Sequence, residues 1–470
     1  MKKILESLLE THVLFLVIAL IFGLIFIKIT PPLWGLDEPS HFDRVYQITR
    51  GEIIPNRTAD NYGGKVPINL YNLGNYSIGD LVDDKTNNLG PSRKDVDNES
   101  IYVQFEKQDF STKMHNSPSS SSYSPVAYIG PIIGVLLAKA VNLDIGNTLF
   151  LARLFTLLVY VSTVVIALLV LKRTKVKWLF FMIALLPTVM FQASVVTADN
   201  ILIGLSLLFA ALLIRLFKNS DEAVSQRLFL SLMCVGVLLP LVKVNYVFLS
   251  LAILLVPYNM YKSKNLSILI KFIGVSLAIF FGLLWSTLAK VTGQASISQR
   301  PDGVQVIIAN QIANLVHDPF HFIELFIRSL LQYSDSYIQQ STTLVGWNYV
   351  SLPLFFIILL SIITVFATMH AKDEFIKFRG KIFVLSGFAI LGLGSIFASF
   401  FITFTPTTSA VIQGVQGRYF IPFLIPIFLA VAILLPVRVS IKERMAPSIF
   451  GITSCFCLLL TVVYYYVITY

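Results

Sequence analysis

The feature that most constrains this chain is a series of apolar runs, most of them long enough to cross a bilayer. A helix needs about 20 largely apolar residues to do so, and only helices and closed barrels satisfy the backbone there. The alternation typical of barrel strands is missing. Of the 470 residues, 56% are apolar and 13% are charged, with a mean hydropathy of +0.75, whereas soluble domains carry about 25% charge. The sequence therefore predicts an all-α, polytopic membrane protein.

We expect about eleven transmembrane helices in a single integral-membrane domain, residues 1–470. The first follows Lys2 and Lys3 and covers Val13 to Ile27. No small-residue cleavage pattern follows it, so we interpret it as an uncleaved signal anchor. The other expected spans are 149–171, 178–196, 201–217, 228–243, 244–260, 266–289, 350–369, 381–405, 419–436 and 448–468.

Lysine and arginine gather in alternate connections, at 172–177, 218–227, 262–264, 372–381 and 438–444. Because cytoplasmic loops are enriched in these residues, the pattern predicts a cytoplasmic N-terminus and an outside C-terminus. It also accounts for most of the net charge, 36 − 26 = +10, so no nucleic acid partner is needed.

Two long extracytoplasmic loops follow from this orientation, at 31–148 and 290–349. Within the first, Pro125 to Val141 is apolar but contains prolines and Lys139, which favours a juxtamembrane or re-entrant helix. Apolar spacing in the second loop favours amphipathic helices on the membrane surface. The polar mass lies on one side of the membrane, where we expect the protein to act.

Two neighbouring carboxylates, Asp37 and Glu38, follow the first span directly. Pro39 suits the first turn of a helix and Gly51 its end. The carboxylates would then lie at a helix N-terminus near the lipid headgroups. Two readings remain open from spacing alone: helix capping, worth about 1 kcal/mol, and general-base chemistry.

Three further charges lie at expected outer span boundaries: Asp199, Lys243 and Arg418. Asp199 is either an interfacial residue or a partner of Lys243, while Lys243 either snorkels or binds an anion, such as a lipid phosphate. Arg418 follows Gly414 and Gly417, and its guanidinium fork suits a phosphate or a structural carboxylate.

Together these residues offer carboxylates as bases and cations as anion receptors on one outer surface. That combination fits group transfer from a lipid phosphate. The sequence has no Walker or Rossmann motif, which argues against a nucleotide as the direct donor. No metal-ligand spacing was found, so no metal site is predicted.

An ordered set of motifs then resembles the GT-C superfamily, integral-membrane glycosyltransferases that use polyprenyl-phosphate-linked sugars. Within that clan, the chain is most similar to a bacterial membrane-protein family of unknown function, along nearly its whole length. The stretches that carry the resemblance are Asp37 to Phe42, Tyr123 to Tyr128, Ala152 to Leu154, Ala198-Asp199, Lys243 with Tyr246, Leu344 to Trp347, and Gln416 to Phe420.

The resemblance implies an inverting sugar transfer to a cell-envelope glycan at the outer face of the bacterial plasma membrane. Asp37 would be the base, with Glu38 as its neighbour or as the base itself, and Arg418 and Lys243 would lie near the donor phosphate. Members differ in metal use, so the resemblance allows a divalent cation without implying one. The residues it assigns to substrate or acceptor are His41, Asp199, Tyr246, Tyr128, Trp347 and Gln416.

Two other functions stay open at this stage. A polysaccharide polymerase would share the lipid-phosphate chemistry but join whole repeat units. A lipid-linked-glycan flippase or transporter would need polar residues along a path through the bilayer midplane, and spans such as 149–171 and 448–468 offer few.

Overall fold

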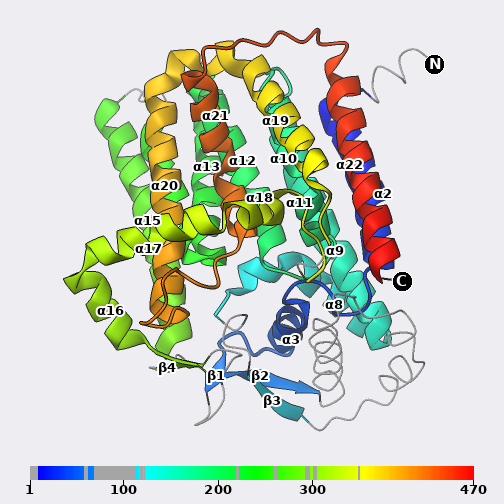
Figure 1. Cartoon of the computed structure of the whole chain (residues 1–470), viewed down its shortest axis with the longest axis vertical. Helices are drawn as coiled ribbons and strands as arrows, with labels where there is room; N and C mark the ends of the chain where they lie inside the picture. The colour runs from blue at the N-terminus through cyan, green and yellow to red at the C-terminus, as the bar shows by residue number, and fades with distance from the viewer. Residues whose placement is uncertain are drawn as a thin grey trace.

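Long apolar helices form the body of the protein in this computed structural model (Figure 1). The structure describes residues 9–57, 62–67, 112–116, 120, 122–218, 222–257, 263–291, 297–299, 304–347 and 350–469. Most of the segment 58–121, which belongs to the predicted loop 31–148, lies outside these residues. So do short parts of the predicted loop 290–349.

The long helices are α2 (Thr11–Ile29), α9 (Ile145–Val170), α12 (Asp199–Lys218), α13 (Glu222–Val242), α15 (Lys264–Val291), α19 (Leu354–Phe375), α20 (Arg379–Thr403) and α22 (Ala446–Thr469). The shorter ones are α3 (Glu38–Thr49), η1 (Pro125–Tyr128), α8 (Ile129–Ala140), α10 (Lys177–Ala184), α11 (Pro187–Ala193), η2 (Val244–Tyr246), α14 (Val247–Ser250), η3 (Leu251–Leu255), α16 (Ile308–His317), α17 (Pro319–Gln332), α18 (Ser334–Thr342), η4 (Ile376–Phe378), η5 (Gly417–Phe423) and α21 (Leu424–Leu434).

Seven segments in the described part of the chain are long and apolar enough to cross a membrane: Thr11–Ile29, Ile145–Val170, Asp199–Lys218, Lys264–Ala289, Leu354–Thr403, Gly417–Leu434 and Ala446–Thr469. The fifth contains both α19 and α20, joined by η4. The protein is therefore an all-α, polytopic membrane protein with about seven candidate spans. The count of eleven and the orientation stay predictions.

Pro187 explains why the predicted span 178–196 falls short of a full span. It lacks an amide donor and pushes the preceding residue out of helical geometry. Leu186 accordingly has ψ 135° before Pro187, so the predicted span 178–196 is divided into α10 and α11. Pro240 lies inside α13, and the following run consists of the short helices η2, α14 and η3.

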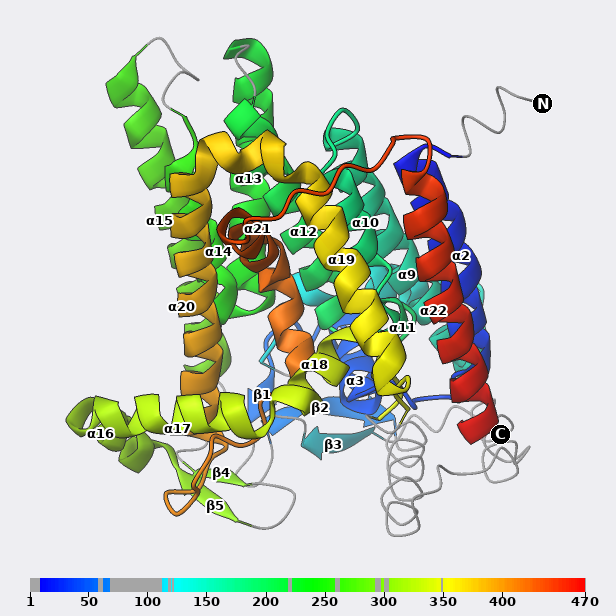
Figure 2. The same ribbon diagram turned by 45° about the horizontal axis from the view of Figure 1, so that its top comes forward.

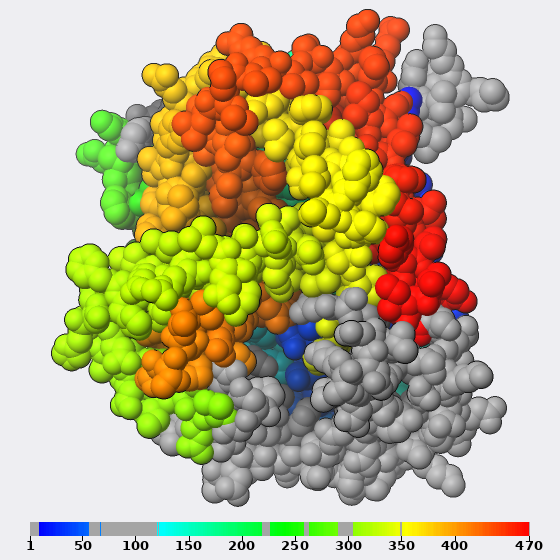
Figure 3. All heavy atoms as spheres, in the orientation of Figure 1, coloured from blue at the N-terminus to red at the C-terminus, as the bar shows by residue number. Residues whose placement is uncertain are grey.

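The connections gather at two ends of the bundle (Figures 1 and 2). The α3 end carries α3, α16, two small sheets and the C-terminal end of α22. The opposite end carries the start of α2, η4 and the connection 435–445. In Figure 3 the orange segment 404–416 and the yellow-green helices cover part of the α3 end, and blue atoms of the N-terminal region are visible beside them.

Two small antiparallel sheets, which the sequence did not predict, lie at the α3 end. One has the order β1 (Asn56–Arg57), β2 (Tyr62–Pro67) and β3 (Thr112–Asn116), and the other pairs β4 (Ile297–Gln299) with β5 (Gln305–Ile307). In the first sheet, Gly63 pairs with Asn116 and Pro67 with Thr112. These strands are too short and too polar to resemble membrane spans.

The apolar segment near the end of the first predicted loop forms η1 and α8, and α8 packs along α9. Gly130 and Gly134 permit this close approach: a Cβ would lie 2.7 Å from the carbonyl oxygen of Phe155 at the first position and 2.4 Å from that of Leu151 at the second. Two small residues four apart are a common device for bringing helix backbones together in membranes. The helix predicted from Pro125 is thus present, and it is too short to span a bilayer.

Candidate functional site

The chain turns sharply between α2 and α3, at the two carboxylates singled out in the sequence. Asp37 has a left-handed backbone conformation with φ 59°, and α3 begins at Glu38 with Pro39 in its first turn. Gly51, just beyond the helix, has φ 91°, as its predicted place at the helix end requires. The Asp37 side chain makes no capping hydrogen bond. The turn sends the two neighbouring carboxylates into different surroundings.

Glu38 is fully buried and its carboxylate is hydrogen-bonded through both oxygens. Oε1 accepts from Arg153 Nε at 2.8 Å and from the Val196 amide at 2.9 Å. Oε2 accepts from Arg153 Nη2 at 2.6 Å and from the Gly35 amide at 2.9 Å. Each oxygen thus accepts two hydrogen bonds, which fills the acceptor capacity of the carboxylate. This geometry favours a structural role for Glu38, as the neighbour of the base, over the alternative that the resemblance left open, in which Glu38 is the base itself.

Arg153 completes this anchor from α9. Besides binding Glu38, it donates to the carbonyl oxygens of Thr30 at 2.7 Å and Pro31 at 2.8 Å. It therefore fastens the turn after α2 to the neighbouring helix. Arg153 lies within one of the stretches that carry the family resemblance, and no role was predicted for it. The sequence did contain a signal for this role: Arg153 is a charged residue inside an apolar run. Such residues usually pair with an opposite charge or with backbone carbonyls.

Asp37, Asp199, Lys243 and Arg418 meet in one cluster at the α3 end, which we call the charge cluster. Arg418 Nη2 donates to Asp37 Oδ2 at 2.5 Å, and Arg418 Nε lies 3.3 Å from Asp199 Oδ2. Lys243 Nζ donates to Asp199 Oδ1. The sequence had proposed the Asp199–Lys243 partnership, and the structure contains it. The Asp37–Arg418 pair was not anticipated.

Burial differs strongly within the charge cluster. The side chains of Arg418 and Asp199 are 4% and 5% exposed and that of Lys243 is 12% exposed, whereas 43% of the Asp37 side chain is accessible. Asp37 is thus the member that faces outward. Arg418 Nη1 is buried and has no hydrogen-bond partner among the described residues.

Local structure explains how these side chains converge. Asp199 is the first residue of α12, where the helix dipole favours a negative charge. Lys243 lies in extended conformation between α13 and η2. Gly417 begins η5 so close to α18 that a Cβ would lie 2.1 Å from the Tyr337 carbonyl oxygen, and its amide donates to Gln340 Oε1 at 2.6 Å. These contacts hold Arg418 in place.

Aromatic rings surround the ammonium group of Lys243. Nζ lies 4.6 Å from the ring centroid of Tyr419 and 5.2 Å from that of Tyr123. The Tyr246 hydroxyl donates to the Tyr419 carbonyl oxygen at 2.8 Å, and the Tyr246 ring stacks on Phe423. Tyr246 therefore supports the segment that carries Arg418. The sequence reasoning assigned no role to Tyr123 or Tyr419, although both lie inside motifs that it quoted.

His41 lies next to the charge cluster on α3. Its Nδ1 is 2.7 Å from the Tyr128 hydroxyl, and its ring stacks on Tyr123 at 5.7 Å. Burial lowers the pKa of His41 to about 4, although Asp37 and Asp199 act in the opposite direction. The imidazole is therefore neutral near pH 7. His41 and Tyr128, both predicted to bind substrate, form one polar pair beside Asp37.

For Trp347 and Gln416, the other two predicted substrate-binding residues, no side-chain hydrogen bond to the charge cluster is present in the described part of the chain. Trp347 Nε1 and Gln416 Oε1 are buried atoms without hydrogen-bond partners among the described residues. Gln416 precedes η5, and Gly346 and Trp347 lie between Val345 and Val350, which are joined by an antiparallel bridge. Neither residue is placed in a shared site by these contacts.

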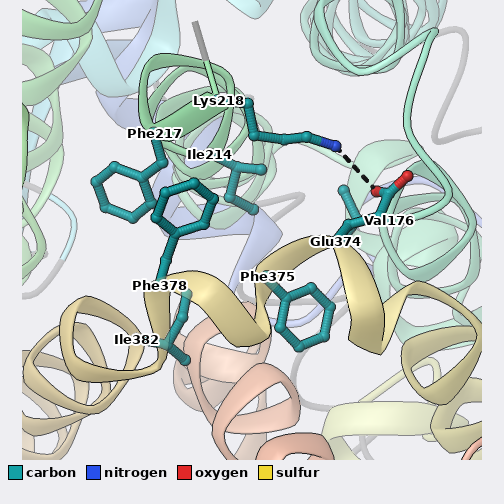
Figure 4. A pocket seen from close by; sticks show the side chains of 8 residues that line it. All are labelled: Val176, Ile214, Phe217, Lys218, Glu374, Phe375, Phe378 and Ile382. Carbon is teal, nitrogen blue, oxygen red and sulfur yellow. Dashed lines mark ion pairs between the residues drawn. The ribbon is translucent and has the colours of Figure 1, made fainter.

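A separate small pocket lies at the opposite end of α12 (Figure 4). Lys218, the last residue of that helix, pairs with Glu374 at 3.4 Å, and the Glu374 carboxylate also accepts the Lys175 amide at 3.0 Å. The other lining side chains are apolar: Val176, Ile214, Phe217, Phe375, Phe378 and Ile382. This arrangement joins the ends of α12 and α19 to the connection before α10, and we assign it a structural role. Among the described residues, no group of three or more His, Cys, Asp or Glu suits a metal ion.

Residues 20–427 match the model of a protein family described as "Predicted membrane protein (DUF2142)". The chain belongs to this DUF2142 family. The match supports a multi-pass membrane protein and includes every member of the charge cluster. No curated protein and no solved structure matches the chain. Assignment of this DUF2142 protein to the GT-C superfamily stays a prediction.

Proposed function

We propose that this DUF2142 protein is an inverting glycosyltransferase that uses a polyprenyl-phosphate-linked sugar and a cell-envelope glycan acceptor. The motif resemblance supports the class of reaction. One structural observation supports the proposal most directly: the partly exposed Asp37 carboxylate contacts the buried Arg418 guanidinium. The Nη1 atom of that guanidinium has no hydrogen-bond partner among the described residues. The proposed base and the proposed phosphate receptor are thus in direct contact.

The proposed reaction is a single displacement. Asp37 removes the proton from the acceptor hydroxyl, whose oxygen forms a bond to the anomeric carbon of the donor sugar. The bond between that carbon and the phosphate oxygen breaks, and the oxygen leaves with the electron pair on the polyprenyl phosphate. Arg418 and Lys243 offset the negative charge on that leaving group.

The remaining parts of the cluster have supporting roles in this scheme. Asp199 orients both cations, and the Tyr123 and Tyr419 rings shield Lys243 from water. Neutral His41 and Tyr128 offer hydrogen bonds to an acceptor sugar near Asp37. Glu38 acts indirectly, by holding the turn from which Asp37 projects.

We further propose that the α3 end faces outward from the bacterial plasma membrane, with eleven helical passes. Basic residues at the opposite end support this orientation, because Arg438, Lys442 and Arg444 all lie in the connection 435–445 there. The proposed donor and acceptor would then meet outside the cell. Interrupted helices such as α10 with α11 count as single passes in this scheme.

The test is the glycan composition of the envelope in cells that lack the gene. Complementation with the wild-type gene or with Asp335→Asn, a control at an exposed carboxylate of α18, should restore a missing side-chain sugar. Asp37→Asn should reach the membrane in equal amount and fail to restore it. Asn is isosteric and tolerates a positive φ, so folding should survive.

Other outcomes would point elsewhere. Shortened chains in the deleted cells would favour a polymerase, and lipid-linked glycan accumulating inside would favour a flippase. Full complementation by Asp37→Asn would refute the assignment of the base.

A further inference from the structure

Arg418 has two carboxylate partners that differ in how easily they can be displaced. Asp199 is buried and also held by Lys243, whereas Asp37 projects from a turn and is 43% exposed. Exposed ion pairs contribute little to stability, while removing one partner of a buried pair is costly. The Asp37 side of Arg418 is therefore the exchangeable one.

The guanidinium also has an unused position. Its Nη1 is buried without a hydrogen-bond partner among the described residues, next to the Nη2 that donates to Asp37 and, at 3.4 Å, to the Tyr419 hydroxyl. Nε also makes no hydrogen bond there and faces Asp199 as an ion pair at 3.3 Å. Two neighbouring guanidinium nitrogens bind two oxygens of a phosphate in parallel. Asp37, bonded only through Nη2, leaves half of this fork empty.

A difficulty in the proposed reaction points the same way. While Asp37 is paired with Arg418, its Oδ2 accepts a hydrogen bond from Nη2 and is not free to accept the proton of an acceptor hydroxyl. Arg418, for its part, is neutralised by its two carboxylates. In this state neither residue is ready for its proposed role.

We propose that a phosphate group takes the place of Asp37 on Arg418, and that this exchange releases the Asp37 carboxylate to act as a base. The inference rests on the proposed function and adds its control: the base becomes active only when a donor phosphate is bound. The phosphate occupies Nη1 and Nη2, while Asp199 keeps Nε and Lys243. The oxygens of the freed carboxylate can then accept the hydrogen bond of the acceptor hydroxyl.

The exchange makes an unusual prediction, that removing the base strengthens donor binding. Asp37→Asn abolishes both the competing ion pair and the repulsion between two anions. We expect it to bind a polyprenyl phosphate about fivefold more tightly than the wild type, the ratio that corresponds to about 1 kcal/mol. Asp335→Asn changes the net charge equally and should bind like the wild type. Arg418→Lys, which keeps the charge but lacks the fork, should bind more weakly.

The experiment titrates full-length protein in nanodiscs with three probes: a polyprenyl phosphate, the neutral polyprenol and inorganic phosphate. The lipid phosphate and the free anion separate the two possible sources of the phosphate group. Tighter binding of Asp37→Asn to the lipid phosphate, without a change for the polyprenol, supports the exchange. Equal or weaker binding by Asp37→Asn overturns it, even if the wild type transfers sugar.

The proposed function fails separately. If the wild type binds polyprenyl phosphate and polyprenol equally, or if Asp37→Asn strengthens the binding of inorganic phosphate alone, the lipid-linked donor is refuted. The exchange is then tested by comparing the binding of inorganic phosphate to the wild type and to Asp37→Asn. If none of the three probes binds, both proposals are refuted.

Discussion

The buried anchor formed by Glu38 and Arg153 predicts that Glu38→Gln harms stability first. The substitution removes one negative charge and replaces one acceptor oxygen by an NH₂ group. Whichever oxygen is replaced, that NH₂ faces two donors: Arg153 Nε with the Val196 amide, or Arg153 Nη2 with the Gly35 amide. Arg153 remains buried and charged. Breaking such a pair costs about 3–5 kcal/mol, so we expect a large fall in stability.

The assay is the apparent melting temperature in detergent, followed by the loss of monodisperse protein on heating. Glu10→Gln is the matched control, because Glu10 pairs with Lys172 on the surface, where both side chains are well exposed. Surface pairs of this kind contribute at most about 1 kcal/mol. Glu38→Gln and Arg153→Gln should each lower the melting temperature far more than the control does.

A double variant sharpens the result. If the two residues stabilise the protein through each other, Glu38→Gln with Arg153→Gln should cost much less than the sum of the single changes. Additive costs would show that the pair is not coupled. A Glu38→Gln protein with wild-type stability but no sugar transfer would refute the structural assignment and return Glu38 to the position of base.

Three further predictions address other parts of the molecule. Burial keeps the pKa of His41 at about 4 in the folded protein, against about 6.5 unfolded; the unfolded chain therefore binds the extra proton in this window, and the unfolding free energy should fall by up to about 3 kcal/mol as pH drops from 6.5 to 4. His41→Gln should remove that part of the pH dependence, and an unchanged pH profile of the melting temperature would contradict it. Gly417→Ala should destabilise the protein and weaken phosphate binding because its Cβ would collide with backbone, whereas Gly387→Ala, with open space around it, should be neutral in both measurements. In a cysteine-free background, Asp335→Cys should react with an impermeant thiol reagent from outside and Arg438→Cys should not; the reverse labelling would overturn the orientation.

The placement of charges along the sequence predicted which residues gather at one end of the bundle. It was less informative about how those residues pair. Alternating basic connections placed Asp37, Asp199, Lys243 and Arg418 on one side, and all four meet in the charge cluster. The choice between adjacent carboxylates was beyond reach. It depends on a left-handed residue at Asp37, a conformation that no periodicity reveals and that sends Glu38 inward to Arg153.

The shortfall in span length and the location of the charge cluster have a common structural basis. The spans were predicted from the composition of apolar runs. Composition does not reveal that Pro187 divides one predicted span, 178–196, or that the helix of another, 228–243, stops before Lys243. Interrupted backbone at membrane depth is tolerated only where protein covers it or where it lines a cavity. All seven residues of α11 are buried, and the chain continues from there to Asp199. On the other interrupted run, the junction between α13 and η2 carries Lys243. Because these helices are interrupted, charged residues lie within the bundle near its α3 end together with their polar partners. The interruptions of the regular spans therefore indicate where to look for a functional site.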